Sequence, residues 1–228
     1  MLHIPIDSLL PTPDSHPKKR LQNMKNFFSL SLIILLLTLN VACCAKKDAQ
    51  NAGAGVDWLA GHAEDAARFA EIFPVSQDNP FIFAAFDEVE MLLKYGTGLV
   101  VFAFPACPRC KNAFPVLEQA FKEMEMDRHA GTRGKIFYYD IFEDRQANSE
   151  RYLTLVEYLK EFLPLDANGN PRIYSPDVFF LAQGKIEGHH LDTVASLKNP
   201  LDPLNDEQKE ELLKIYKDLL TKVKDCGC

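Results

Sequence analysis

The sequence lacks the features of several common protein classes. Beyond residue 50 it has no Lys- and Arg-rich patch interleaved with aromatic side chains, and its formal net charge is −7. Nucleic-acid binding is therefore not expected. It contains no internal repeat and no low-complexity tract, and its 228 residues leave room for one domain with a substantial core and hardly for two.

The N-terminal region lacks an apolar run long enough to span a membrane comfortably, but it has the order of a secretory signal. A basic cluster at residues 18–25 precedes an apolar run over residues 27–42, and a small residue and two lysines follow. This order predicts a signal peptide over residues 1–45 and an extracytoplasmic mature protein. The segment from Met24 would make an ordinary signal by itself. Residues 1–23 are therefore either an extension of the basic N-terminal region of the signal or the result of a wrongly assigned start codon.

Cys43 and Cys44 follow the apolar run directly, where a bacterial lipoprotein carries the cysteine that is acylated. The residues before Cys43 supply the usual small residue at the cut, Ala42, but an Asn stands where Leu is usual. We interpret this site as a lipid anchor that holds the protein at the membrane surface. The alternative is simple peptidase cleavage near Ala42 or Ala45 and a secreted protein.

The cysteines are not distributed as in a disulfide scaffold. A scaffold of exported proteins would scatter its cysteines to close long loops. Here the six occur as close pairs, which indicates sulfur chemistry rather than structural staples: Cys43 and Cys44, Cys107 and Cys110, and Cys226 and Cys228.

Apolar periodicity and turn signals predict the element order βαβαβαββα. The predicted strands cover 81–85, 99–104, 135–141, 178–182 and 185–191, and the predicted helices cover 87–95, 108–126, 149–163 and 205–223. A polar, flexible linker over 46–56 and an N-terminal helical extension over 57–79 precede the main domain, 80–225, and a Cys-Gly-Cys tail, 226–228, follows it. The order predicts an α/β fold with a central mixed sheet flanked by helices.

Side-chain patterns set the expected faces and ends of several elements. In the extension, Trp58, His62, Ala66, Phe69 and Phe73 recur at helical spacing. In the helix over 149–163 we expect Leu153, Val156, Leu159 and Leu163 to face inward. Gln183-Gly184 predicts a hairpin turn, and Asn205 with Gln208 predicts a capped helix start.

The dithiol Cys107-Pro108-Arg109-Cys110 follows a buried strand and opens a helix. The free N–H groups and the positive end of the helix dipole would stabilise a thiolate on Cys107, which we predict to be the more exposed cysteine and the nucleophile. Cys110 would then attack the mixed disulfide and release the substrate. Arg109 either adds a positive charge beside the thiolate or is a solvated charge with little effect.

The same CxxC spacing supplies half of many zinc sites. No second CxxC motif and no spaced pair of histidines completes a tetrahedron here. His189 and His190 are adjacent in a predicted strand, which places them on opposite faces. The sequence therefore favours redox chemistry over zinc, with no metal and no cofactor expected.

Further residues around the dithiol make the sequence resemble the thioredoxin superfamily over roughly residues 80–223. Lys111 follows the motif directly and Pro115 stands four residues further on; later, Pro176 precedes an apolar strand and Gly184. The resemblance implies a thioredoxin-like fold, here with an extra helix inserted before Pro176. It also implies a cis bond between Ser175 and Pro176 beside the sulfurs, with an ordinary trans proline as the alternative.

Within that superfamily, residues 96–107 are similar to bacterial proteins described as bacteriocin-transport accessory or general thioredoxin-family proteins. The implied activity is that of a thiol–disulfide oxidoreductase. Its implied partners are the thiols and disulfides of exported proteins and a membrane-bound electron donor or acceptor. The sequence leaves the direction of electron flow open.

The sequence departs from the thioredoxin pattern at two positions near the dithiol. Ala106 replaces the Trp before the first cysteine, so the substrate groove differs. Val101 replaces the buried acid that assists proton transfer, with Asp140 or water as substitutes. The extra helix before Pro176 could in addition shape a partner surface.

Cys226 and Cys228 end the last predicted helix, and three interpretations remain open for them. They are a second redox pair that exchanges with Cys107 and Cys110, a soft-metal site for ions such as Cu(I), or bystanders. The second interpretation supports an alternative function, in which the chain handles copper or zinc, or binds a partner, on a thioredoxin scaffold without turnover.

Overall fold

The structure, a computed structural model, describes residues 61–129 and 134–226. Their centre is a mixed sheet of five strands in the order β1-β3-β2-β4-β5. The strands are β1 (Phe81–Phe83), β2 (Gly98–Ala103), β3 (Ile136–Asp140), β4 (Asp177–Ala182) and β5 (Lys185–Leu191). β1, β3 and β2 run parallel, whereas β4 is antiparallel to both β2 and β5. The predicted α/β fold with a central mixed sheet is confirmed, and each strand lies within two residues of its expected bounds.

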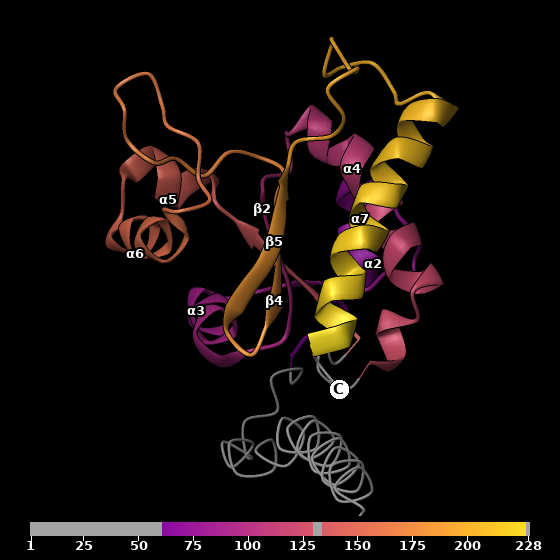
Figure 1. Cartoon of the computed structure of the whole chain (residues 1–228), viewed down its shortest axis with the longest axis horizontal. Coiled ribbons are helices and arrows are strands. Elements are labelled where there is room, and N and C mark those ends of the chain that lie inside the picture. The colour runs from indigo at the N-terminus through magenta and orange to yellow at the C-terminus, as the bar shows by residue number, and fades with distance from the viewer. Residues whose placement is uncertain (1–60, 130–133, 227–228) are drawn as a thin grey trace, which may run out of the picture. The chain divides into compact units, whose positions relative to one another are not determined.

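Helices cover both faces of this sheet (Figure 1). One face carries α2 (Asp65–Ile72), α4 (Pro108–Glu123) and α7 (Asp206–Cys226), and the short helix η1 (Met126–Arg128) follows α4. The other face carries α3 (Phe86–Tyr95) and α6 (Glu150–Leu159), with α5 (Phe142–Ala147) directly before α6. Two hydrophobic clusters, one on each face, therefore share the sheet between them.

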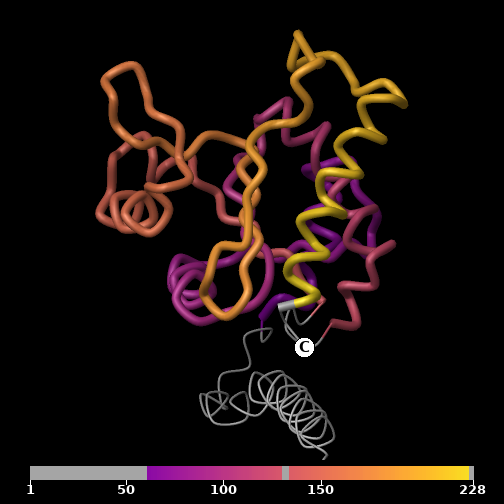
Figure 2. Tube along the Cα trace, in the orientation of Figure 1, coloured from indigo at the N-terminus to yellow at the C-terminus, as the bar shows by residue number. Residues whose placement is uncertain are grey.

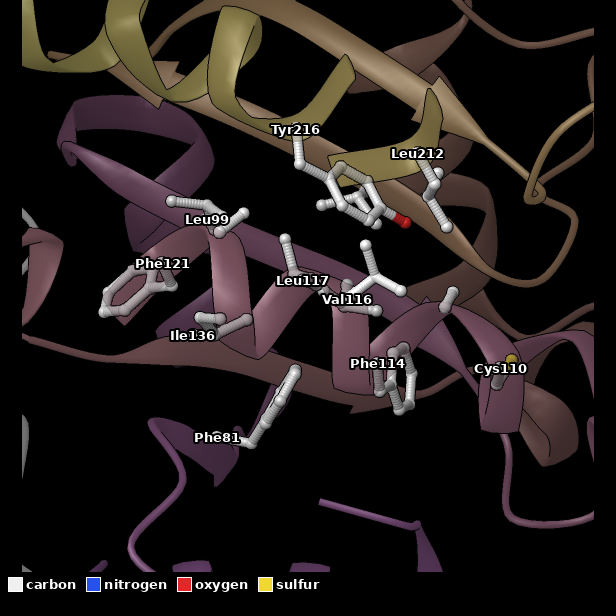
Figure 3. Packing of buried hydrophobic residues seen from close by; sticks show 14 of the residues in the cluster. Phe81, Leu99, Cys110, Phe114, Val116, Leu117, Phe121, Ile136, Leu212 and Tyr216 are labelled. Atoms are coloured by element: carbon white, nitrogen blue, oxygen red, sulfur yellow. The ribbon is translucent and has the colours of Figure 1, made fainter. Parts of the chain in front are cut away.

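The larger cluster contains the dithiol. Figure 3 shows Cys110 at one end of α4, with Phe114, Leu117 and Phe121 along the helix and Tyr216 of α7 approaching from the other side. All five of these residues are fully buried. Because Phe69 of α2 and Phe73, directly after α2, belong to the same cluster, the N-terminal extension is part of the core that holds the dithiol.

The segment between β3 and β4 differs from the expectation. The helix predicted over 149–163 is α6, which ends at Leu159, and the separate helix α5 precedes it. Asn148 ends α5 in a left-handed conformation, and Ser149 caps α6 by accepting a hydrogen bond from Tyr152 N at 3.1 Å. The inward face is set by Tyr152 and Leu155, so the prediction that Leu153 faces inward is wrong: it is 49% exposed.

Other helices also differ in their bounds. α2 begins at Asp65, so His62 lies before the helix rather than within it; α4 ends at Glu123, and α7 continues to Cys226. The hairpin turn and the helix cap are confirmed. β4 and β5 pair across Gln183-Gly184, and Asn205 and Gln208 exchange hydrogen bonds of 2.9 and 3.0 Å between side chain and backbone.

α7 lies alongside α4 and runs in the same direction (Figure 2). Near the start of both helices, the Asn112 amide donates to the carbonyl oxygen of Asp202 at 2.8 Å. Near their ends, Lys224 Nζ donates to the carbonyl oxygen of Met124 at 3.2 Å. The dithiol opens α4, so Cys226, the last residue of α7, lies near the opposite end of α4.

Several predictions concern residues outside the described part of the chain. These are the signal peptide, the lipidation site at Cys43 and Cys44, the linker, Trp58 and Cys228. Among the helices of residues 61–129 and 134–226, none is long and apolar enough to cross a membrane.

Candidate active site

Strand β2 delivers the chain to the dithiol. All six residues of β2 are buried, and after three loop residues Cys107 becomes the N-cap of α4, with Pro108 as its first residue. Proline suits this position because its missing N–H would have no partner in the helix. Cys107 and Cys110 form a disulfide across the first turn, with their Cα atoms 5.3 Å apart.

The N-terminus of α4 points one backbone donor at the sulfur of Cys107. The N–H of Cys110 donates to Cys107 Sγ at 3.2 Å. A sulfur that carries negative charge is stabilised at such a position by this donor and by the helix dipole. α4 therefore provides the electrostatic setting that the sequence predicts for a thiolate.

Cys107 is the more exposed of the two cysteines, as expected, but both are buried in this disulfide form. Cys107 is 2% exposed and Cys110 is 0% exposed. The loop before β4 is one reason, since the carbonyl oxygen of Ser175 lies 3.7 Å from Cys107 Sγ.

The loop before β4 also carries the proline expected opposite the dithiol. The Ser175–Pro176 peptide bond is cis, as the resemblance implied, and Pro176 is buried. The short distance from Ser175 O to Cys107 Sγ shows that the loop and the dithiol face each other. β2 and β4 are hydrogen-bonded neighbours, so the sheet itself holds these two segments together.

Arg109 has a partner that neither interpretation of its role included. Its guanidinium forms an ion pair with the carboxylate of Asp192, and each side chain is 35% exposed. The backbone N–H of Asp192 also donates to the carbonyl oxygen of Pro176 at 2.8 Å. No sequence pattern marks Asp192 as a site residue, because it follows β5, far along the chain from the dithiol.

Lys111 and Pro115 lie in α4 as expected from their sequence positions. Lys111 is exposed and Pro115 is half-buried within the helix. Beside Lys111 is a shallow depression of about 410 Å³, lined by Ala106, Pro108, Lys111, Asn112, Pro200, Leu201 and Pro203. A larger depression of about 510 Å³ lies near the other end of α4, next to Phe121 and Lys122, and no cysteine lines it.

Two carboxylates near the site behave differently. Asp140 is exposed and accepts a hydrogen bond at 3.0 Å from the N–H of Phe142, the first residue of α5. Asp177, directly after the cis-proline, is fully buried, and burial raises its pKa even though His189 lies 3.3 Å away. In the sequence, Asp177 differs from other acidic residues only in that it directly precedes an apolar strand.

Asp177 lies on the opposite face of the sheet from Cys110. Val178, the next residue of β4, belongs to the cluster that contains Cys110. His189, the partner of Asp177, stacks on Phe179 of the second cluster, with ring centroids 5.2 Å apart. Asp177 therefore does not take the position of an acid beneath Cys110.

The histidines of β5 face opposite sides of the sheet, as predicted. His189 stacks on Phe179, whereas His190 contacts Tyr216 of α7, with ring centroids 5.5 Å apart. Within the described residues, no three His, Cys, Asp or Glu side chains gather in a way that could hold a metal ion.

The chain was compared with protein-family models, curated proteins and solved structures, and none of them matches it. What is established is an α/β domain with a mixed five-stranded sheet and a buried Cys107–Cys110 pair at the start of a helix.

Proposed function

We propose that this chain is an extracytoplasmic thioredoxin-like protein that exchanges disulfides with exported proteins through Cys107 and Cys110. The observation that carries the proposal is the 3.7 Å distance between Cys107 Sγ and the carbonyl oxygen of Ser175. It brings together a disulfide at a helix N-terminus and the backbone of the loop directly before β4, next to a cis-proline. An extended polypeptide that pairs with this segment would bring its own sulfur to Cys107.

The proposed reaction needs only sulfur chemistry. In the reducing direction, the Cys107 thiolate attacks a substrate disulfide, a mixed disulfide forms, and one substrate thiolate leaves. Cys110 then attacks Cys107 Sγ, the mixed disulfide breaks, and the second substrate thiolate leaves. The substrate gains two electrons and the dithiol becomes the disulfide; a dithiol of a second protein must then reduce it.

The oxidising direction is the same sequence in reverse. The Cys107–Cys110 disulfide accepts two electrons from a substrate dithiol, and a disulfide-bearing partner restores it. We propose that this electron donor or acceptor is bound to the membrane. The proposed location outside the cytoplasm rests on the signal-like region 1–45, and attachment to the membrane rests on Cys43 and Cys44.

Replacement of each cysteine in turn tests the mechanism. With a disulfide-bonded exported protein as substrate, Cys107→Ser should abolish exchange. Cys110→Ser should instead accumulate a mixed disulfide, because the first step still occurs and the resolving thiol is missing. Non-reducing electrophoresis after acid quenching detects that adduct. Full exchange activity in Cys107→Ser would overturn the proposal.

The double variant Cys226→Ser/Cys228→Ser serves as the comparison. α4 spans about 24 Å between the dithiol and the end beside Cys226, and two further residues reach at most about 7 Å. Direct exchange between the tail and Cys107 within one molecule is therefore not expected, and the double variant should keep the rate of the unmodified chain.

A further inference from the structure

The helical segment between β3 and β4 places an arginine against both loops of the candidate active site. The Arg145 guanidinium donates to the carbonyl oxygen of Ile173 at 3.3 Å and lies 5.5 Å from the ring centre of Phe104. Ile173 stands shortly before Ser175, and the carbonyl oxygen of Phe104 accepts a hydrogen bond from Cys107 N at 3.1 Å. Arg145 is therefore next to the position where a substrate chain would lie.

Arg172 brings a second positive charge to this place. Its guanidinium lies 5.6 Å from the ring centre of Tyr174, the residue before Ser175. Burial, together with the positive charge of Arg172, lowers the pKa of Arg145, so the two cations are close enough to repel each other. Two like charges beside one loop are an arrangement that an anion would stabilise.

Neither guanidinium has a carboxylate partner within the described residues. Asp140 and Asp166 act on the two arginines only from beyond ion-pair distance. Asp140 accepts a hydrogen bond from Phe142 N, and Asp166 accepts hydrogen bonds from backbone N–H groups at 2.8 and 2.9 Å. Arg145 Nε is buried without any hydrogen-bond partner. In a chain with a net charge of −7, two guanidinium groups at one place therefore lack an ion-pair partner in the part that the structure describes.

Aromatic rings border the two arginines. Phe142 and Tyr174 are 38% and 37% exposed, and the rings of Phe104 and Phe142 lie 5.5 Å apart. We call Phe104, Phe142, Arg145, Arg172 and Tyr174 the arginine surface. Guanidinium groups beside aromatic rings bind carboxylates in a defined orientation, and the rings contact the apolar part of the same ligand.

We propose that the arginine surface binds an acidic segment of the polypeptide whose disulfide or thiol is exchanged. The inference rests on the proposed function and adds a substrate preference to it. The occupant is a polypeptide because the surface continues into the loop at Ser175, whose backbone carbonyl lies beside Cys107 and can pair with a main chain. It is acidic because a carboxylate of the substrate would give the two unpaired guanidinium groups the close ion-pair partner that they lack among the described residues.

Peptides that differ only in charge test this preference. Each carries one cysteine linked to a chromophoric thiol, and the cysteine is flanked by two Asp, two Asn or two Lys residues. With the reduced full-length chain at low ionic strength, the Asp peptide should react about three- to tenfold faster than the Asn peptide. The advantage should shrink as salt screens the charges.

Variants assign the preference to the surface. Arg145→Gln/Arg172→Gln should reduce the advantage of the Asp peptide to less than twofold, and Arg172→Glu should favour the Lys peptide. If the double variant fails to fold because Arg145 no longer donates to the carbonyl oxygen of Ile173, the single variant Arg172→Gln, which keeps that hydrogen bond, should still reduce the preference. Arg128→Gln is the matched control, because Arg128 is 78% exposed and lies beyond the far end of α4; it should keep the full preference.

Two readouts separate this inference from the proposed function. Reaction of the reduced chain with the free chromophoric disulfide reports on the dithiol alone, and its absence would overturn the proposed function. Fluorescence anisotropy of an Asp peptide with Ser in place of Cys reports on binding alone. Equal rates and equal binding for the Asp and Asn peptides would overturn the inference, and so would a full preference for the Asp peptide in Arg145→Gln/Arg172→Gln.

Discussion

The guanidinium of Arg109, between the two cysteines, is paired with the carboxylate of Asp192. The backbone of Asp192 is at the same time hydrogen-bonded to Pro176. One residue at the end of β5 thus joins the helix that carries the dithiol to the loop that faces it. It also offsets the positive charge that would otherwise act on the sulfurs.

Removal of that negative charge should make the dithiol more oxidising. In Asp192→Asn the charge of Arg109 is uncompensated and stabilises a thiolate on Cys107, and therefore the reduced form. Because the pair is partly exposed, we expect the reduction potential to rise by at most about 20 mV. Equilibration with dithiothreitol buffers of known potential measures the change.

The double variant Arg109→Gln/Asp192→Asn provides the control for that measurement. It removes both charges, so its reduction potential should return close to that of the unmodified chain. A potential in Asp192→Asn that is unchanged, or lower, would show that Asp192 does not compensate Arg109.

His62 should make the packing of the N-terminal extension against the rest of the domain depend on pH. Its Nδ1 lies 2.6 Å from Asp65 and its Nε2 lies 2.9 Å from Glu88. Burial lowers the pKa of His62, but the hydrogen bonds to Glu88 and Asp65 outweigh it and raise the pKa above its ordinary 6.5. The stabilisation is therefore fully present below pH 6.5 and is lost as the pH rises through the folded-state pKa.

Urea unfolding of the full chain and of His62→Gln, at several pH values between 5.5 and 8.5, measures this effect. The free energy of unfolding should fall by about 1 to 2 kcal/mol in the variant at the lowest pH, and the loss should shrink toward the highest. Glu88→Gln should lower the pKa of His62 in an NMR titration. A difference that does not change with pH would contradict the expectation.

The sheet could be predicted from the sequence because its strands are apolar runs bounded by turn residues. β2 and β4 are buried at all six positions each, and such runs carry a strong signal. The helix that follows Cys107 and the hairpin at Gly184 have similarly local causes. Ser175 and Pro176 could be predicted only through the family resemblance.

The remainder of the site depends on contacts between distant parts of the chain. No local pattern marks Asp192 as the partner of Arg109, or Arg145 as a neighbour of Phe104. The burial of Cys107 has the same origin, since the covering loop comes from the start of β4. The break between α5 and α6 is local, but the apolar residues on both sides of it resemble one longer helix.

Gly184→Ala should destabilise the hairpin strongly. Gly184 has a φ of +76°, and an added Cβ would collide with the backbone carbonyl group of Lys94. We expect a loss of about 3 kcal/mol in the free energy of unfolding, from the collision and the left-handed backbone together. Gly169→Ala is the control, because Gly169 also has a positive φ, +82°, but nothing lies near its Cβ position. It should lose about 1 kcal/mol, and equal losses would refute the collision.

Asp177→Asn should stabilise the protein at neutral pH and not in acid. Burial raises the pKa of Asp177 above its ordinary 3.8, so the folded state favours the neutral carboxyl. Below pH 3.8 residue 177 is uncharged in the variant and in the unmodified chain, and the two should be equally stable. As the pH rises through the folded-state pKa, only the unmodified chain must bury a charge. The free energy of unfolding should therefore be higher in the variant by on the order of 1 kcal/mol at pH 7. Urea unfolding at pH 3.5 and pH 7 measures both values. A less stable variant at pH 7 would mean that the ionised carboxylate and His189 stabilise each other by more than the burial costs.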